Sequence, residues 1–252
     1  MRLAATLAVA VLAVVTVATA AKADWDEGDP YKMHYPQLPD VNGWDIDMQE
    51  YRLADDFLCT QTGPITDVHF WCSWADDRVT EIEGIHVSLH RNLPAAENPF
   101  GTWSMPGDLI CEFRVSPGDF TIREWDEQGP QGWIWPAVLP YYAAPGNHYR
   151  IFQVNIAGID LPDFRQEAGE IYWLDLQVNT GSILGWKSSV DHFEDDAVWI
   201  RFNEGDVPYW QPLVDPITGA SIDLAFVITP EPATLAFLGL GLAGLLARRR
   251  RK

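Results

Sequence analysis

Paired acidic residues are the part of this sequence whose type and spacing could do chemistry. They occur at Asp55–Asp56, Asp76–Asp77 and Glu194–Asp195–Asp196. Two carboxyl groups about 5 to 10 Å apart can hydrolyse a glycosidic bond. The chain has 36 acidic residues among 252, however, so an acidic surface produces such pairs without any active site. A secreted glycan-active hydrolase that uses paired carboxylates is therefore an alternative and not the first prediction.

Sequence signatures of other enzyme classes are missing. The chain contains no G-x-S-x-G turn for a nucleophilic serine and no H-E-x-x-H helix for zinc. Its cysteines lack the spacing of a zinc finger. The sequence therefore favours a non-enzymatic protein.

Calcium binding is a second use of the acidic residues, because Ca²⁺ takes about six to eight oxygen ligands. The segment that begins at Asp24 fails as an EF-hand, since Gly28 is one place early and Tyr35 stands where Glu is needed. We predict a different kind of calcium site, and no other cofactor, formed by Asp55, Asp56, Asp195 and Asp196. The alternative is that these residues only shape turns at strand ends.

Aromatic residues are the most unusual feature, with 12 Trp in the chain. Trp and Tyr rings stack on sugar rings, and long loops such as 129–146 are often functional. We therefore predict binding of an extracellular polysaccharide by the residues in and beside this loop: Trp125, Trp133, Trp135, Tyr141 and Tyr142. Four other tryptophans are expected to fill the core: Trp71, Trp74, Trp173 and Trp199.

The three cysteines, Cys59, Cys72 and Cys111, are an odd number, so one thiol stays free or pairs with another chain. If residues 60–64 form a hairpin turn, Cys59 and Cys72 lie on opposite faces of one sheet and cannot pair. We predict a Cys72–Cys111 disulfide. Three buried free thiols are the main alternative.

The elements that must position these residues are strands. Apolar residues take every second place at 85–90 and nearly so at 151–156, which puts one face of each strand on a core. No convincing helical period occurs in 24–230. We expect an all-β fold, an antiparallel β-sandwich or jelly roll at 51–229, after an extended arm at 24–50. The expected strands are 51–59, 65–71, 84–90, 109–115, 120–125, 148–156, 170–178, 183–186, 198–202 and 222–228.

The N-terminal end has the layout of a secretory signal peptide. Arg2 precedes an apolar run from Leu3 to Ala21, and Ala21-Lys22-Ala23 has small residues where signal peptidase needs them. We expect a signal helix at 1–23 and cleavage after Ala23. An uncleaved anchor is the alternative.

The C-terminal end has three parts, a Pro230-Glu231-Pro232 entry, an apolar run at 233–247, and a basic stop. The run makes a helix of about 22 Å, which can sit across a thin membrane with its basic end in the cytoplasm. A transmembrane helix that anchors the protein before processing is therefore expected. The basic stop contains Arg248, Arg249, Arg250, Arg251 and Lys252.

This ordered C-terminal segment resembles the PEP-CTERM sorting signal of exported bacterial proteins. The resemblance covers about the last 24 residues and implies cleavage near Pro230-Glu231-Pro232 by an exosortase. It further implies delivery to the cell surface or extracellular matrix. An ordinary tail anchor is the alternative.

The body between the two ends also resembles a known group, an uncharacterised domain that accompanies PEP-CTERM tails in planctomycete-type bacteria. The resemblance rests on segments such as Leu53-Ala54-Asp55-Asp56-Phe57 and Asp195-Asp196-Ala197-Val198-Trp199. It spans about 30–228, implies one exported β domain, and supplies no catalytic residues. Cys72 stands where this group is expected to have glycine.

The net charge of the body limits the kinds of partner that we expect. Residues 24–230 hold 10 basic and 35 acidic residues, and a surface this acidic repels phosphate backbones, so we expect no nucleic-acid partner. The expected function is a surface or matrix protein that binds or builds extracellular polymer. A calcium-stabilised adhesion module is a further alternative.

Overall fold

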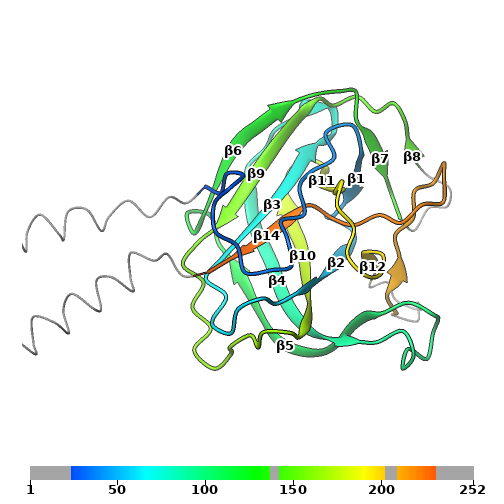
Figure 1. Cartoon of the computed structure of the whole chain (residues 1–252). Helices are drawn as coiled ribbons and strands as arrows, with labels where there is room; N and C mark the ends of the chain where they lie inside the picture. Colours follow the sequence, from blue (N-terminus) through cyan, green and yellow to red (C-terminus); the bar gives the residue numbers. More distant parts are fainter. Residues whose placement is uncertain (1–23, 137–141, 202–208, 231–252) are drawn as a thin grey trace, which may run out of the picture. The chain divides into compact units, whose positions relative to one another are not determined.

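The computed structural model describes residues 24–136, 142–201 and 209–230. These residues form two β-sheets and one 3₁₀ turn at Ala75–Asp77 (Figure 1), so the all-β prediction is confirmed. No helix in the described ranges is long and apolar enough to cross a membrane. The predicted signal helix at 1–23 and the apolar run and basic stop at 233–252 lie outside these ranges.

The first sheet has eight strands in the order β6-β9-β3-β11-β1-β7-β8, with β14 also paired to β3. It is mixed, because β1 and β7 run parallel while its other pairs are antiparallel. The expected fully antiparallel arrangement is therefore wrong at this one pair. The strands are β1 (Trp44–Asp47), β3 (Asp67–Trp74), β6 (Phe120–Glu127), β7 (Gly132–Ile134), β8 (Tyr142–Ala143), β9 (Arg150–Ile156), β11 (Leu184–Lys187) and β14 (Phe226–Thr229).

The second sheet has six antiparallel strands in the order β13-β12-β2-β10-β4-β5. Its long central strands pair over many residues, which fixes the face on which each side chain lies. The strands are β2 (Arg52–Leu58), β4 (Ile82–Leu93), β5 (Met105–Val115), β10 (Ile171–Thr180), β12 (Val198–Ile200) and β13 (Gln211–Pro212).

A single large core lies between the two sheets, as in a β-sandwich. Phe57 of β2 contacts Phe226 of β14 with ring centroids 5.8 Å apart, which joins the sheets directly. The four tryptophans expected in the interior are all buried. Trp71 packs on Trp25 of the N-terminal segment within the large core, whereas Trp173 belongs to a second cluster with Trp210.

The N-terminal segment at 24–50 is part of the fold. It contributes β1, and Met33 bridges to Cys59 at the end of β2. Trp25 is buried, and its carbonyl oxygen accepts hydrogen bonds from Arg123 and Gln153. The extended arm is thus anchored along most of its length.

The predicted hairpin between 51–59 and 65–71 is wrong. β2 belongs to the six-stranded sheet and β3 to the eight-stranded sheet, so the intervening turn crosses between sheets. The register argument for the cysteines therefore fails. Cys72 of β3 and Cys111 of β5 also lie in different sheets, and all three cysteines are free. The predicted Cys72–Cys111 disulfide is absent from the structure, and only Cys111 is partly exposed.

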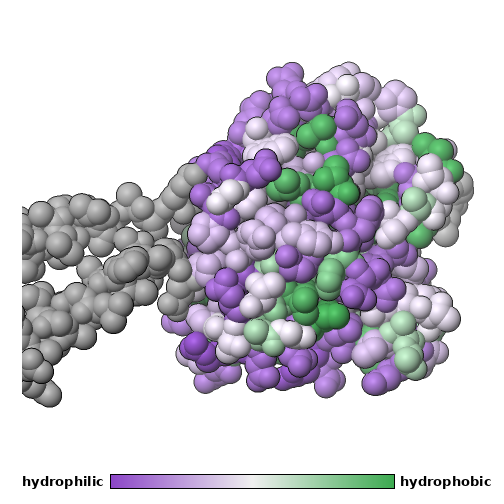
Figure 2. Space-filling view, in the orientation of Figure 1, coloured by the Kyte–Doolittle hydropathy of each residue, from purple (hydrophilic) through white to green (hydrophobic). Residues whose placement is uncertain are grey.

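The surface is mostly hydrophilic. On the face drawn in Figure 2, apolar residues gather only in separate patches between polar ones.

Candidate functional site

Three of the five predicted sugar-binding aromatics meet at the β1-β7-β8 end of the eight-stranded sheet. Trp133 of β7 lies 5.8 Å from Trp135, and β8 begins at Tyr142 and pairs with β7. Trp125 lies elsewhere, on β6, half-buried against Trp71. Tyr141 lies outside the described residues.

The exposure of these side chains differs sharply. The Trp133 side chain is 2% exposed, because its ring packs edge-on against His148. Tyr142 is 39% exposed and offers its ring to solvent. Of the two, only Tyr142 has a free face on which a sugar could stack.

Trp44 of β1 is the aromatic residue at this end that sequence reasoning missed. Its ring meets Tyr142 edge-on, with centroids 5.8 Å apart. The other side of the ring lies against β7, where a Cβ atom at Gly132 would come within 2.4 Å of it. Only glycine therefore allows this close packing, which holds the Trp44 ring in place.

Asp215 fixes the Trp44 ring from the opposite direction. The indole Nε1 donates to Asp215 Oδ2 over 2.8 Å, and the backbone N–H groups of Ile217 and Thr218 donate to Oδ1. Burial alone would raise the pKa of Asp215, but these hydrogen bonds outweigh it and lower the pKa. Asp215 is therefore an ionised acceptor beside the ring.

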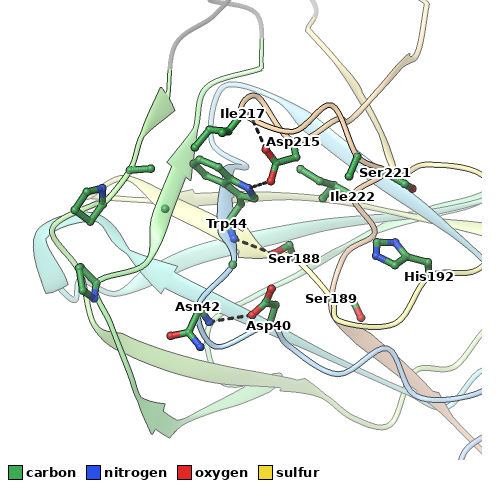
Figure 3. A pocket seen from close by; sticks show the side chains of 16 residues that line it. Asp40, Asn42, Trp44, Ser188, Ser189, His192, Asp215, Ile217, Ser221 and Ile222 are labelled. Carbon is green, nitrogen blue, oxygen red and sulfur yellow. Dashed lines mark hydrogen bonds between the residues drawn. The ribbon is translucent and has the colours of Figure 1, made fainter.

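Trp44, Gly132 and Asp215 line a groove with a volume of about 370 Å³ (Figure 3). Tyr142 contacts the Trp44 ring but is not itself part of the groove lining. The backbone N–H of Trp44 donates to Ser188 Oγ over 2.9 Å, and Asp40 accepts from the N–H of Asn42. His192 is on the far side, with half of its side chain exposed. Carboxylate, amide, hydroxyl and imidazole groups thus surround one aromatic wall. We call this feature the Trp44 groove; its polar lining includes Asp40, Asn42, Ser188, Ser189, His192, Asp215 and Ser221.

The acids predicted to bind calcium are brought to one region, with Asp55 and Asp56 buried on β2. Asp55 accepts hydrogen bonds from the Gln37 amide at 2.8 Å and from the Leu224 N–H at 2.6 Å. Asp56 is 1% exposed, and neither of its carboxyl oxygens has a hydrogen-bond partner in the described part of the chain. Asp56 is therefore a buried acid whose oxygens are unsatisfied.

Asp223, which sequence reasoning missed, completes this region. Burial raises its pKa to about 6. Burial and the charge of Asp223 also raise the pKa values of Asp55 and Asp56 well above their usual range. We call Asp55, Asp56 and Asp223 the acidic cluster.

The other two predicted calcium ligands lie in the loop before β12. Asp195 and Glu194 act electrostatically on Asp56, and Asp196 acts on Asp223. Asp195 also accepts a hydrogen bond from the Ser104 N–H over 2.7 Å. In the residues that the structure describes, no group of three or more His, Cys, Asp or Glu side chains converges as a metal site would. Ligation here would need amide or backbone oxygens in addition.

A second buried charged group lies on the outer face of the eight-stranded sheet. Asp45 Oδ2 is 2.8 Å from His148 Nε2 and 2.9 Å from Lys187 Nζ, and all three side chains are fully buried. Burial alone would raise the pKa of Asp45, but Lys187 and His148 hold it below its usual value. We call Asp45, His148 and Lys187 the ionic triad.

Two arrangements that suggest catalysis have structural roles instead. Ser88 donates directly to buried Asp175, which Arg52 also contacts, so no histidine lies between serine and carboxylate as nucleophile activation requires. Asp77 of the Asp76–Asp77 pair accepts the backbone N–H groups of Tyr149 and Arg150. These carboxylates serve to hold strands and loops in place.

Comparison with known proteins finds one match in the body of the chain and another at its C-terminal end. Residues 33–229 match the family model described as a domain of unknown function (DUF7901). Residues 229–252 match the PEP-CTERM protein-sorting motif. No curated protein and no solved structure matches the chain. The chain therefore belongs to the DUF7901 domain family and carries a PEP-CTERM sorting motif at residues 229–252.

Proposed function

We propose that this protein is a non-enzymatic binding module of the cell surface or extracellular matrix, and that its Trp44 groove binds carbohydrate. The PEP-CTERM motif implies an exported protein that an exosortase processes, so the body is expected to work outside the cell. The observation that carries the proposal is the groove itself, where Trp44, held in place by Gly132 and Tyr142, stands beside ionised Asp215.

The chemistry of the groove suits a sugar. Aromatic faces and edges pack against the C–H side of a pyranose ring, while carboxylate and amide groups accept and donate hydrogen bonds to its hydroxyls. Asp40, Asn42 and His192 provide such groups across the groove from Trp44. Two of the predicted residues, Trp133 and Trp125, support the fold in this proposal and do not touch the sugar.

The test is a titration of the purified protein with oligosaccharides chosen from a glycan array. Asn42→Ala and Asp215→Asn each change a polar side chain that lines the groove. Each should weaken binding at least about tenfold, which corresponds to a contact worth about 1.4 kcal/mol or more. Trp125→Ala, which changes an aromatic residue outside the groove, is the matched control and should bind as the wild type does. Binding that ignores both groove substitutions would rule the site out.

Calcium stabilisation is a second candidate function, and a specific observation favours it. Three buried acceptor atoms lack hydrogen-bond partners among the described residues, namely Gln37 Oε1 and both oxygens of Asp56. Asp223 Oδ1 makes no hydrogen bond there either, and lies 3.6 Å from His192 Nδ1. The Gln37 amide is correctly oriented, because its Nε2 already donates to Asp55 and Leu224. Oxygen atoms without donors are the ligands that Ca²⁺ prefers.

The calcium candidate is tested by thermal unfolding with chelator and with added Ca²⁺. The melting temperature should rise with Ca²⁺ in the wild type and respond much less in Asp56→Asn. A melting temperature that chelation leaves unchanged would exclude a stabilising cation.

Export and processing complete the proposal. Signal peptidase is expected to cut after Ala23. The apolar run at 233–247 is expected to anchor the precursor in the membrane as a helix until exosortase cleaves near Pro230-Glu231-Pro232. Mass spectrometry of the surface protein should find termini near residues 24 and 230. A surface form that retains the basic stop would contradict exosortase cleavage at this position.

A further inference from the structure

The Asp45–Lys187 pair is held in an unusually close and dry position. Asp45 on β1 and Lys187 on β11 are direct register partners on neighbouring strands, and their side chains are fully buried. Lys187 Nζ lies 2.9 Å from Asp45 Oδ2. Backbone pairing of the two strands thus presses an amine-bearing and a carboxyl-bearing side chain together where water is excluded.

Neighbouring groups orient both members of the pair. His148 Nε2 lies 2.8 Å from the same Asp45 oxygen, and Gln131 Oε1 accepts from Lys187 Nζ over 2.7 Å. Trp133 packs against the His148 ring and closes the site. The second oxygen of Asp45 and His148 Nδ1 have no hydrogen-bond partner in the described residues, so His148 carries its proton toward Asp45.

We propose that Lys187 and Asp45 join through an intramolecular isopeptide bond. Lys187 Nζ, as the free amine, attacks the carboxyl carbon of Asp45 and forms the new C–N bond. The C–O bond to one carboxyl oxygen breaks, and that oxygen leaves as water. One ammonium proton passes to the carboxylate before the attack, which leaves the free amine and a carboxylic acid, and the attacking nitrogen then gives up the second proton of the departing water. The product is a neutral amide, and no oxidant, cofactor or energy source is consumed.

His148 is the catalytic residue of this step, because it touches the reacting oxygen. Its Nε2–H can donate to Asp45 Oδ2 as negative charge develops there, and can return a proton to the departing oxygen. Burial lowers the pKa of Lys187, which favours the uncharged amine that attack requires. Lys187 Nζ is held 2.9 Å from an oxygen of the carboxyl group that it attacks, so the reaction has the advantage of an intramolecular step.

The other buried ion pair serves as an internal comparison. Arg52 and Asp175 are as close, but a guanidinium stays protonated and is no nucleophile. The three cysteines are all free, so a bond between β1 and β11 would be a covalent link that this domain otherwise lacks. It would connect the N-terminal strand to the centre of the eight-stranded sheet.

The experiment is peptide mass spectrometry on a tryptic digest of the purified, denatured full-length protein. The peptides that contain Asp45 and Lys187 should appear joined, at the sum of their masses less one water (about 18 Da), with cleavage after Lys187 lost. Separate, unmodified peptides from folded wild-type protein after prolonged storage would overturn the proposal, and this readout needs no variant.

Two variants sharpen the assignment. Lys187→Arg keeps the positive charge but cannot form the amide, so the joined peptide should vanish. His148→Gln keeps a side-chain N–H but loses the imidazole ring that can pass a proton, so the joined fraction should fall severalfold soon after refolding. A joined fraction that His148→Gln leaves unchanged would remove the catalytic role of His148.

Discussion

Asp45 and Asp56 are both buried carboxyl groups of one domain, yet their surroundings are opposite. Asp45 lies against Lys187 and His148, whereas Asp56 faces the charges of Asp223 and Asp195. Burial by itself raises the pKa of any carboxyl group. Cationic neighbours reverse this effect at Asp45, and acidic neighbours reinforce it at Asp56.

The difference is instructive because cations are scarce in this domain. Residues 24–230 contain 10 basic residues, and one of them, Lys187, is enclosed within the ionic triad. Buried charges are normally paired, coordinated to a metal, or neutralised by a proton. In the ionic triad, Lys187 neutralises Asp45 from within the domain. The acidic cluster has His192 at 3.6 Å from Asp223, and needs further protons or a cation to be neutralised.

Lys187→Met should have the largest effect, a loss of about 3 to 5 kcal/mol in the free energy of unfolding. The substitution leaves Asp45 buried without its cation. Urea unfolding followed by tryptophan fluorescence measures the loss. A loss below about 1 kcal/mol would contradict a structural role for the triad.

The matched double variant separates a salt bridge from a covalent bond. Asp45→Leu combined with Lys187→Met removes both charges and fills the space with apolar atoms. If the wild-type pair is only ionic, the double variant should regain most of the lost stability. If the wild-type pair is covalently joined, much of the loss should remain.

The acidic cluster should destabilise the domain as the pH rises. Because Asp223 has a pKa of about 6, the folded state holds a proton that the unfolded state releases near pH 4, so the free energy of unfolding falls between these values. The expected change for this group is about 3 kcal/mol at most. Asp45 acts in the opposite direction, since its contribution is lost only as the pH falls below its ordinary value near 3.8.

The difference in stability between wild type and Asp223→Asn isolates the contribution of Asp223 to the pH dependence. His34, whose pKa burial lowers to about 4, makes the wild type more stable as the pH rises through the same window. Wild type and Asp223→Asn both contain His34, so its contribution cancels when their unfolding curves, both measured in chelator, are compared. The stability of the variant relative to wild type should therefore grow from pH 4 to pH 7. A constant difference would mean that Asp223 is ionised throughout.

Asp56→Asn should stabilise the domain by about 1 to 2 kcal/mol at pH 7 in chelator, because it removes a buried carboxyl group whose ionisation is opposed by burial and by Asp223. Thermal or urea unfolding measures this gain. Asp119→Asn, at an exposed turn, is the control and should change stability by less than about 0.5 kcal/mol. Destabilisation by Asp56→Asn in chelator would show that the carboxylate has a favourable partner.

Local patterns predicted the strands but not their partners. Alternation at 85–90 and 151–156 correctly indicated β4 and β9, although β9 is buried on both faces and not on one. The turn at 60–64 could not reveal that β2 and β3 lie in different sheets, because hairpin turns and inter-sheet turns have similar composition. The loop at 129–146 concealed β7 and β8, whose pairing depends on β1 far away in sequence.

Local sequence patterns likewise identified parts of the candidate sites but not the distant residues that complete them. Asp55–Asp56 and Asp195–Asp196 were identifiable as doublets, but Asp223 stands alone before an apolar strand and carries no local signal. Asp45 and Lys187 are widely separated along the chain and meet only through strand register. Trp44 is held in the groove by Gly132 and Asp215, which are likewise distant from it in sequence.

Gln37 should give the smallest effect and the finest test of the acidic cluster. Gln37→Leu removes the amide that donates to Asp55 and should cost about 0.5 to 1.5 kcal/mol in chelator. It also removes Oε1, so calcium affinity, measured by isothermal titration, should fall severalfold. Gln37→Glu should also lower the stability in chelator, since the added carboxylate repels Asp55, but it should raise the calcium affinity, since the carboxylate attracts Ca²⁺. Equal calcium affinity in both variants would mean that Gln37 only orients Asp55, and that the cluster is neutralised by protons.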